Sequence, residues 1–217
     1  AGYENYGYTS LPDEYNVRMV DLNKQTYSPR WIQDASGRPM KVNLIDAFLS
    51  DDNYIISVTR LKTHDTVIAT LTLKNIVMAA PMNHYGDVRE KKFMHQGAPL
   101  GLHYNMFRVA QHTTPDLAVL DGVEGMQGDG PVRGFAMDHG VVLAGTDFIS
   151  VDRLGVELMN IPYDDVAYLQ WCTAAGMGID DLNRIDVEGP SIDPYRKTYE
   201  LHSRIDWQRT WKTQTKT

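Results

Sequence analysis

The stretch VTRLKTHDTVIATLTLKN, residues 58–75, joins a β-branched run to a helical apolar pattern through a cluster of polar side chains. Its first residues, preceded by Ile55 and Ile56, predict a strand. The apolar spacing after His64 predicts a helix that starts near residue 65 and stops at Pro81. Open α/β sheets bind ligands at strand ends, so the stretch predicts both a fold class and the location of a site.

Strand-like runs alternate with helical patterns along the rest of the chain. The predicted strands are residues 17–22, 42–48, 54–61, 116–121, 140–144 and 185–188, and the further predicted helices are residues 102–113, 148–159 and 163–175. This alternation predicts an α/β fold with a mostly parallel sheet and helices on both faces. The predicted organisation is an irregular N-terminal arm (1–40), an α/β core domain (41–190) and a polar C-terminal tail (191–217).

The composition indicates one globular core. At 217 residues and 42% hydrophobic content, the chain has enough apolar material for a single domain. A net charge of -7 argues against nucleic-acid binding, which usually needs a basic surface. No apolar run reaches the roughly 18 residues of a membrane span, and no signal peptide opens the chain. We therefore expect a soluble protein, cytoplasmic by default or exported if an N-terminal signal has been removed.

A single cysteine, Cys172, limits the cofactors that the chain can hold. It excludes an internal disulfide and any four-thiolate site, so we expect no iron-sulfur cluster within this chain. Its position beside Trp171 in a predicted helix indicates a small core residue rather than a nucleophile.

Aromatic side chains gather near both ends of the chain. Residues 1–40 hold six tyrosines or tryptophans, and the polar tail holds Trp207 and Trp211. We expect these rings to dock onto the chain's own core or onto a partner, in a homo-oligomer or a complex with another chain. The start, AGYENYGYTSLPDEY, has no initiator methionine, so we expect a processed chain or a fragment.

The polar cluster after the first strong strand favours a small anionic ligand. Lys62 and His64 precede the predicted helix, and Thr70, Lys74 and Asn75 lie along it. Free N–H groups and the positive end of a helix attract a carboxylate or phosphate. We predict that Lys62, Thr70 and Asn75 bind such an anion and that His64 and Lys74 are catalytic. The alternative is that both lysines are solvated and that His64 only caps the helix.

Two carboxylates follow the predicted strand at residues 116–121. Strand-end carboxylates can hold a hard cation or act as acid and base. We predict that Asp121 is catalytic and that Asp121, Glu124 and His95 bind a divalent metal. Gly130, in the glycine-rich turn expected next, is predicted to let the backbone approach the ligand. For Asp147, at the next strand end, helix capping is an equally good explanation.

The polar connection of residues 82–101 is long for a simple link, and such loops are often functional. It carries Lys91 and two histidines, and two more histidines follow it. The four are His84, His95, His103 and His112. Histidine is a common metal ligand, but these spacings match no zinc motif, so scattered surface histidines are the default interpretation.

Three motifs in this order resemble the prokaryotic family called domain of unknown function 362. They are LKTHDTVIATLTLKN, PDLAVLDGVEGMQGDGP and VVLAGTDFISVDRLGVELM, within residues 55–188. The family pattern falls on Lys62, Thr63, His64, Thr70, Lys74, Asn75, Pro115, Asp116, Asp121, Gly122, Glu124, Gly130, Pro131, Gly134, Gly145, Asp147 and Asp152. The resemblance implies an α/β fold and no established activity. Members commonly carry an additional N-terminal half, which we expect this chain to lack, and some carry a ferredoxin-like cluster domain or a twin-arginine signal.

Two hypotheses of different classes follow. The first is an enzyme-type α/β protein that binds a small anion at a strand-end pocket, with or without a metal. The alternative is a non-catalytic binding or assembly subunit of a larger complex, which can be a redox assembly. A pocket into which Lys62, His64 and Lys74 converge would favour the first hypothesis.

Overall fold

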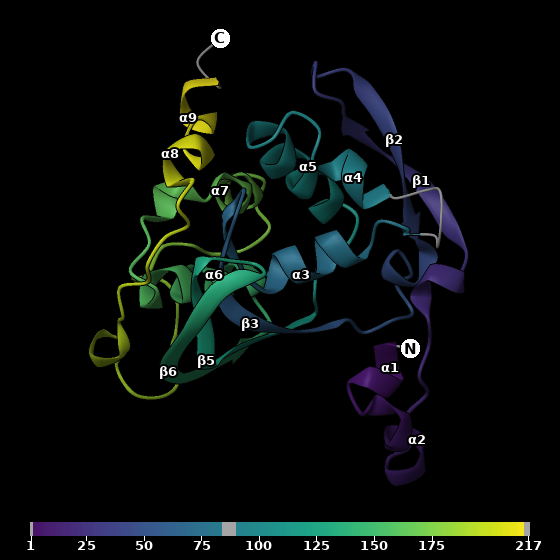
Figure 1. The fold of residues 1–217 in the computed structure, drawn as a ribbon, viewed down its shortest axis with the longest axis horizontal. Helices are drawn as coiled ribbons and strands as arrows, with labels where there is room; N and C mark the ends of the chain where they lie inside the picture. Colours follow the sequence, from purple (N-terminus) through teal and green to yellow (C-terminus); the bar gives the residue numbers. More distant parts are fainter. Residues whose placement is uncertain (1, 84–89, 215–217) are drawn as a thin grey trace.

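A computed structural model describes residues 2–83 and 90–214 of the chain. Its larger sheet has four strands in the order β4-β3-β5-β6, and a separate hairpin joins β1 to β2 (Figure 1). The larger sheet consists of β3 (Ile56–His64), β4 (Ile68–Thr70), β5 (Leu117–Asp129) and β6 (Arg133–Gly145). The hairpin consists of β1 (Tyr27–Gln33) and β2 (Pro39–Ile45), so a strand lies within the predicted N-terminal arm.

The larger sheet is mixed, so the prediction of a mostly parallel sheet is wrong. β3 pairs parallel with β5, but β4 is antiparallel to β3 and β6 is antiparallel to β5. A parallel pair needs a long crossover, which the helices between β4 and β5 supply. β4 and β6 instead follow their partners through short turns, so they run antiparallel. The α/β class itself is confirmed.

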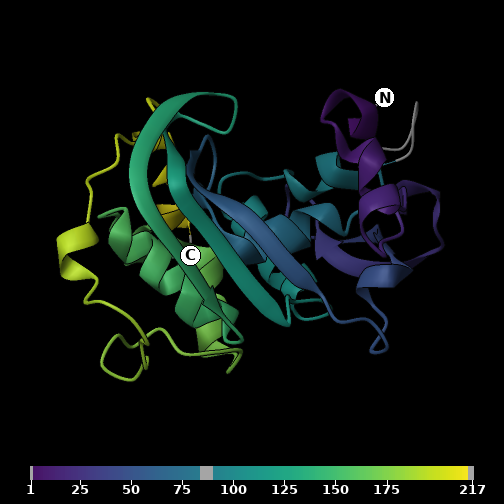
Figure 2. The same cartoon turned by 90° about the horizontal axis from the view of Figure 1, so that it is seen from below.

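The main helices lie on one side of the larger sheet. α3 (Thr72–Ala79) and α6 (Phe148–Leu158) contact its strands, and α5 (Leu100–Ala110) and α7 (Ala167–Ala174) pack behind them (Figure 2). The short helices are α1 (Gly2–Asn5), α2 (Leu11–Glu14), α4 (Glu90–Met94), α8 (Ile205–Gln208) and α9 (Trp211–Gln214). Among the described residues, no helix has the length and hydropathy that a bilayer crossing requires.

The other face of the larger sheet is open over the described part of the chain. Ile56, Val58 and Val142 are 54%, 63% and 57% exposed, although all three are aliphatic. Buried and exposed residues alternate along the first part of β3, as expected for a strand with one solvated face. The predicted helices on both faces are therefore wrong for the residues described.

The glycine-rich segment after Asp121 is strand, not the predicted turn. β5 continues to Asp129 and pairs with β6 along most of its length. A Cβ at Gly130 would collide with the carbonyl oxygen of Thr63, so a side chain there would separate the end of β5 from β3. The glycines therefore serve close strand approach, which a residue pattern alone does not distinguish from a turn.

The helix predicted from residue 65 begins later, at Thr72. Residues 65–67 reverse the chain, and the three residues of β4 then pair back onto β3. Ile68 takes a positive φ of 71° in this reversal. Residues 17–22 and 185–188, which the sequence predicted as strands, form none.

The polar C-terminal tail packs onto the core. Gln208 and Trp211 are buried, and the Trp211 indole donates a hydrogen bond of 3.1 Å to the carbonyl oxygen of Asp165. The aromatic residues of the N-terminal segment differ, because Tyr6 and Tyr15 are 78% and 60% exposed. The C-terminal tryptophan thus docks onto its own chain, and docking of the N-terminal tyrosines stays a prediction.

Asp152, on α6, fixes the start of α3. Its carboxylate accepts hydrogen bonds from the Thr72 amide (2.8 Å), the Thr72 hydroxyl (2.6 Å) and the Leu73 amide (3.0 Å). Leu71, the residue preceding the helix, has no side-chain cap of its own, so Asp152 satisfies these free N–H groups. Burial raises the pKa of Asp152 to about 7, while the three hydrogen bonds oppose that shift. Asp147 caps α6 through Ser150, as the sequence allowed.

Replacing Asp152 with alanine is expected to lower the free energy of unfolding by roughly 2–4 kcal/mol, because it leaves the buried donors at the start of α3 without an acceptor. Chemical denaturation measures the change. Asp52→Ala, which removes an exposed carboxylate, is the control and should stay within about 0.5 kcal/mol of the wild type. Equal losses in both variants would contradict the capping role.

Candidate functional site

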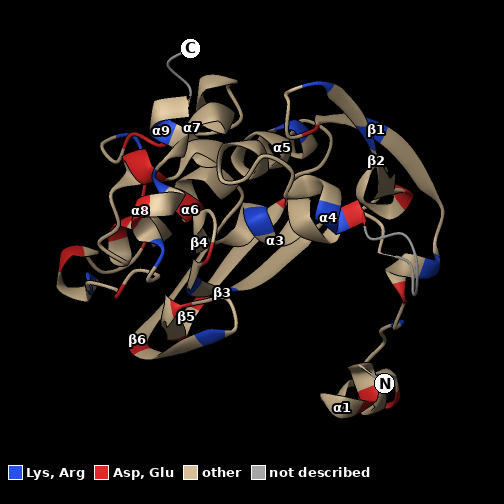
Figure 3. Ribbon diagram, turned by 45° about the horizontal axis from the view of Figure 1, so that its top comes forward, with Lys and Arg blue, Asp and Glu red and all other residues tan. Residues whose placement is uncertain are grey.

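A cavity of about 390 Å³ lies where the end of β3, β4, α3 and α4 meet. Its lining residues are Lys62, His64, Asp65, Thr70, Lys74, Asn75, Met78, Ala79, Lys91, His95 and Pro131. The structure thus brings together five residues of the predicted anion site and one of the predicted metal ligands. Figure 3 shows the basic residues of α3 and α4 on the same side of the molecule.

Strand pairing and helix anchoring position these side chains. Lys62 lies opposite Thr70 in the β3–β4 pair, so the chain reversal brings both to one place. The Asn75 amide donates a hydrogen bond of 3.1 Å to the Ser57 hydroxyl, which donates one of 2.8 Å to the Thr72 carbonyl oxygen. α3 is therefore tied to β3 beside its first turn, and Lys74 lies in that turn.

Lys74 is the most unusual group in the cavity. It is 7% exposed and makes no hydrogen bond or ion pair with the residues that the structure describes. Burial, together with Lys91 and Lys62, lowers the pKa of Lys74 to about 7, and Asp65 opposes the shift. Lysine is rarely buried without a partner, so this position conflicts with ordinary core packing.

His64 is held as a neutral ring. Its Nδ1 accepts hydrogen bonds from the Thr66 amide (3.0 Å) and the Val67 amide (3.4 Å), which leaves the proton on Nε2. Burial and the nearby Lys74 lower the pKa of His64 far below its usual value. Asp65 Oδ1 lies 3.1 Å from Nδ1, but an ion pair there would need a proton where two amides already donate. The Nε2–H is therefore the donor left for the cavity.

The remaining polar groups make the cavity cationic. Burial, Arg60 and Lys91 lower the pKa of the half-buried Lys62. The Thr70 hydroxyl is buried without a hydrogen-bond partner among the described residues. Among the described lining residues, three lysines thus share the cavity with one carboxylate, that of Asp65. Such a lining favours a small anion over a cation.

The predicted acidic residues lie outside this lining. Asp121 is in the middle of β5 and accepts a hydrogen bond of 3.0 Å from the Val123 amide. Glu124 is exposed and pairs with Arg60 at 3.1 Å. Gly130 serves the close approach to β3, and its neighbour Pro131 lines the cavity instead. The sequence placed these groups at the site because it ended the strand at residue 121.

The described residues do not supply a ligand set for the predicted metal site. Among them, no three His, Cys, Asp or Glu side chains form a group that could hold an ion. His95 lines the cavity, where its Nδ1 lies 2.9 Å from the Lys91 carbonyl oxygen. His103 lies in an aromatic cluster, and burial lowers its pKa to about 3. His84 lies outside the described residues. Metal binding stays a prediction.

Sequence reasoning did not assign Lys91 to the site. It lies on α4, and only the fold brings it to Lys62 and Lys74. The available signal was the long polar connection of residues 82–101, in which a lysine stands four residues before His95. That pattern marked the loop as functional without showing which side chain would reach the cavity.

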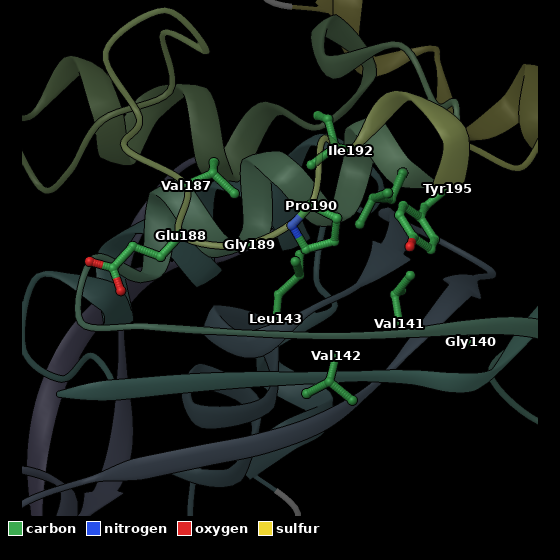
Figure 4. Close-up of a pocket in the computed structure, with 11 residues that line it drawn as sticks. Gly140, Val141, Val142, Leu143, Val187, Glu188, Gly189, Pro190, Ile192 and Tyr195 are labelled. Atoms are coloured by element: carbon green, nitrogen blue, oxygen red, sulfur yellow. The ribbon is translucent and has the colours of Figure 1, made fainter.

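Two other cavities lie beside β6 and have a different character. One, of about 230 Å³, is lined largely by apolar groups, and Figure 4 shows Val141 and Leu143 reaching from β6 toward Pro190 and Tyr195. The other, of about 530 Å³, is larger than the lysine cavity. Asp147 in its lining is already engaged, because it accepts hydrogen bonds from the Ser150 and Ile179 amides. The chemistry of the side chains, rather than size, therefore selects the lysine cavity.

The fold and site define a mixed α/β protein with a cationic cavity at a strand end. The family model for Domain of unknown function (DUF362) matches residues 1–157, so the chain belongs to that family. Thylakoid-associated protein sll1697 of Synechocystis sp. (strain ATCC 27184 / PCC 6803 / Kazusa) is 25% identical over 159 residues. The aligned region covers 73% of this chain and 46% of that relative, so the chain spans about half the relative's length. No solved structure matches the chain.

Replacing Lys74 with methionine is expected to raise the free energy of unfolding by roughly 2–4 kcal/mol at pH 7, because it removes a buried, unpaired ammonium. The folded-state pKa of about 7 lies below the unfolded value of 10.5, so the unfolded chain binds more protons between these values. Wild-type stability should therefore rise with pH from 7 to 10.5. The variant should lack this component of the rise, as measured by denaturation across that range.

Lys92→Met provides the matched control, since Lys92 is exposed on α4 and does not line the cavity. Its stability should differ from the wild type by less than about 0.5 kcal/mol at every pH. A Lys74→Met protein that is less stable than the wild type would contradict the strain assigned to Lys74.

Proposed function

We propose that the chain binds a small anion, a carboxylate or phosphate, in the lysine cavity, and that this cavity is an enzyme-type site. The observation that carries the proposal is the buried ammonium of Lys74, which faces a cavity and has no partner among the described residues. An unpaired buried charge raises the free energy of the folded protein. A bound anion would pair with the ammonium of Lys74 and so stabilise its charged form.

The other lining groups support the same ligand class. Lys62 and Lys91 add positive charge, and the His64 Nε2–H and the Thr70 hydroxyl supply neutral donors. The volume of about 390 Å³ lies at the lower end of the range for small-molecule sites, which suits a small metabolite. The simple alternative, solvated lysines, fits Lys91 but not Lys74.

Calorimetric titration with inorganic phosphate and with malonate tests this function. Lys62→Met and Lys91→Met should each weaken binding by about one to two orders of magnitude, because a charge-assisted hydrogen bond contributes about 1.5–3 kcal/mol. Affinity should fall as pH rises through 7, since Lys74 loses its proton there. Binding between about pH 7 and pH 8 should take up protons, because a bound anion favours the ammonium form.

The Lys92→Met protein should bind as tightly as the wild type, because the substitution removes a lysine from the same helix but not from the cavity. Repeating the titration in buffers of different ionisation enthalpy measures the proton uptake. Binding of neither probe, or equal binding by all three lysine variants, would reject an anion site in this cavity.

The open face of the larger sheet favours a second candidate function, self-association. Its exposed aliphatic side chains include Ile56, Val58 and Val142, and exposed apolar residues on a sheet face can mark an interface. This candidate shares oligomer formation with the assembly hypothesis of the sequence, which placed the interface at the aromatic ends of the chain instead. It is compatible with an anion site, because the cavity residues do not include the exposed aliphatic ones.

Sedimentation velocity over a range of concentrations tests the second candidate. The wild type should form dimers, and Val58→Asp and Val142→Asp should each return it to a monomer, because a carboxylate in an apolar interface is strongly unfavourable. Val132→Asp is the control, since Val132 is 83% exposed in the turn between β5 and β6. A wild type that is monomeric at every concentration would contradict self-association.

A further inference from the structure

We infer that Lys74 is an amine nucleophile that forms an imine with the carbonyl carbon of a small 2-oxo acid bound in the lysine cavity. This inference rests on the proposed function and names its ligand class. Its geometric basis is a cavity in which a buried, unpartnered lysine lies among two further lysines and two neutral hydrogen-bond donors.

The environment of Lys74 favours the reactive form of its amine. Only the neutral amine has a lone pair for attack, and an exposed lysine near neutral pH is almost entirely protonated. Burial and the charges of Lys62 and Lys91 disfavour the ammonium, which brings the pKa of Lys74 to about 7. No acceptor among the described residues holds the amine, so it is available to a ligand.

The other cavity residues can bind the two functional groups of a 2-oxo acid, its carboxylate and its carbonyl. Lys62 and Lys91 remain to bind the carboxylate, which leaves Lys74 for the adjacent carbonyl carbon. The Nε2–H of neutral His64 and the Thr70 hydroxyl can donate hydrogen bonds to the carbonyl oxygen as negative charge develops on it. A phosphate or simple carboxylate lacks the electrophilic carbon, and an aldehyde without a carboxylate would leave the two lysines unused.

The step needs no oxidant or reductant. The lone pair of Lys74 Nζ forms the C–N bond while the π pair of the carbonyl moves onto its oxygen. A proton passes from nitrogen to that oxygen and gives a carbinolamine. With one further proton from solvent, the oxygen leaves as water. The amine, the carbonyl compound and one proton thus become a protonated imine and water.

Reductive trapping of the full chain tests the inference. The protein is incubated with pyruvate and sodium cyanoborohydride, and peptide mass mapping locates the reduced adduct. One adduct is expected, at Lys74. At pyruvate concentrations well below saturation, where the free protein's titration governs the rate, trapping should rise through pH 7 and then level off. Exposed lysines should instead become more reactive up to a pH of about 10. Lys74→Arg keeps the charge and should lose the adduct, whereas Lys92→Met should keep it.

The controls separate this inference from the proposed function. Lactate, which has a hydroxyl in place of the carbonyl, should bind in calorimetry without forming an adduct. Lactate binding that depends on Lys62, with no pyruvate adduct at Lys74, would overturn the imine and leave the anion site intact. Absence of both lactate binding and the pyruvate adduct would reject the anion site as well as the imine. Adducts spread evenly over exposed lysines would also overturn the imine at Lys74. If Lys74→Arg fails to fold, the mapping of adducts on the wild type still tests whether Lys74 forms the imine.

Discussion

The carboxylate of Asp152 at the start of α3 is the contact on which the arrangement of the cavity depends. It comes from α6, eighty residues beyond Thr72, and accepts that residue's amide and hydroxyl protons. Because it fixes the first turn of α3, it also fixes Lys74, two residues later. Asp152 and Lys74 belong to two of the motifs by which the sequence resembles the family, and the hydrogen bonds from Thr72 and Leu73 to Asp152 connect these two motifs physically.

Burying Lys74 requires that α3 be held from both sides. Lysine usually extends its flexible chain until the ammonium reaches water, and a mobile helix would let it do so. Here Asp152 holds the helix toward α6, and the Ser57 hydroxyl holds its first carbonyl toward β3. The ammonium therefore stays beside Lys62 and Lys91 despite their repulsion. We interpret this arrangement as stability given up for a reactive or ligand-binding group.

The cationic part of the site could be predicted because its members are near one another in the sequence. Lys62, His64 and Lys74 fall within one passage from strand to helix, and that pattern located the cavity although β4 was missed. The acidic part was misplaced for a physical reason. The apolar pattern of β5 stops near Asp121, but its ladder of backbone hydrogen bonds continues through glycines that have no side chain to pack. The sequence pattern also predicted parallel strands where the sheet is antiparallel, because it did not distinguish strands joined by short turns from strands joined by long crossovers.

Contacts between distant segments complete the cavity, and no local pattern reports them. The Gln208 side-chain amide donates a hydrogen bond of 2.8 Å to the carbonyl oxygen of His64, across 144 residues. A tail that reads as polar and irregular thus supports the strand end that carries the neutral imidazole. Since the cavity exists only when these segments are assembled, an anion that binds it must favour the folded chain. The same assembly leaves Lys74 only 7% exposed and close to two other lysines, so its ammonium is stabilised by a bound anion or is avoided by loss of its proton. Anion binding and amine reactivity are therefore alternative responses to one constraint, which is why they should depend on pH in opposite directions.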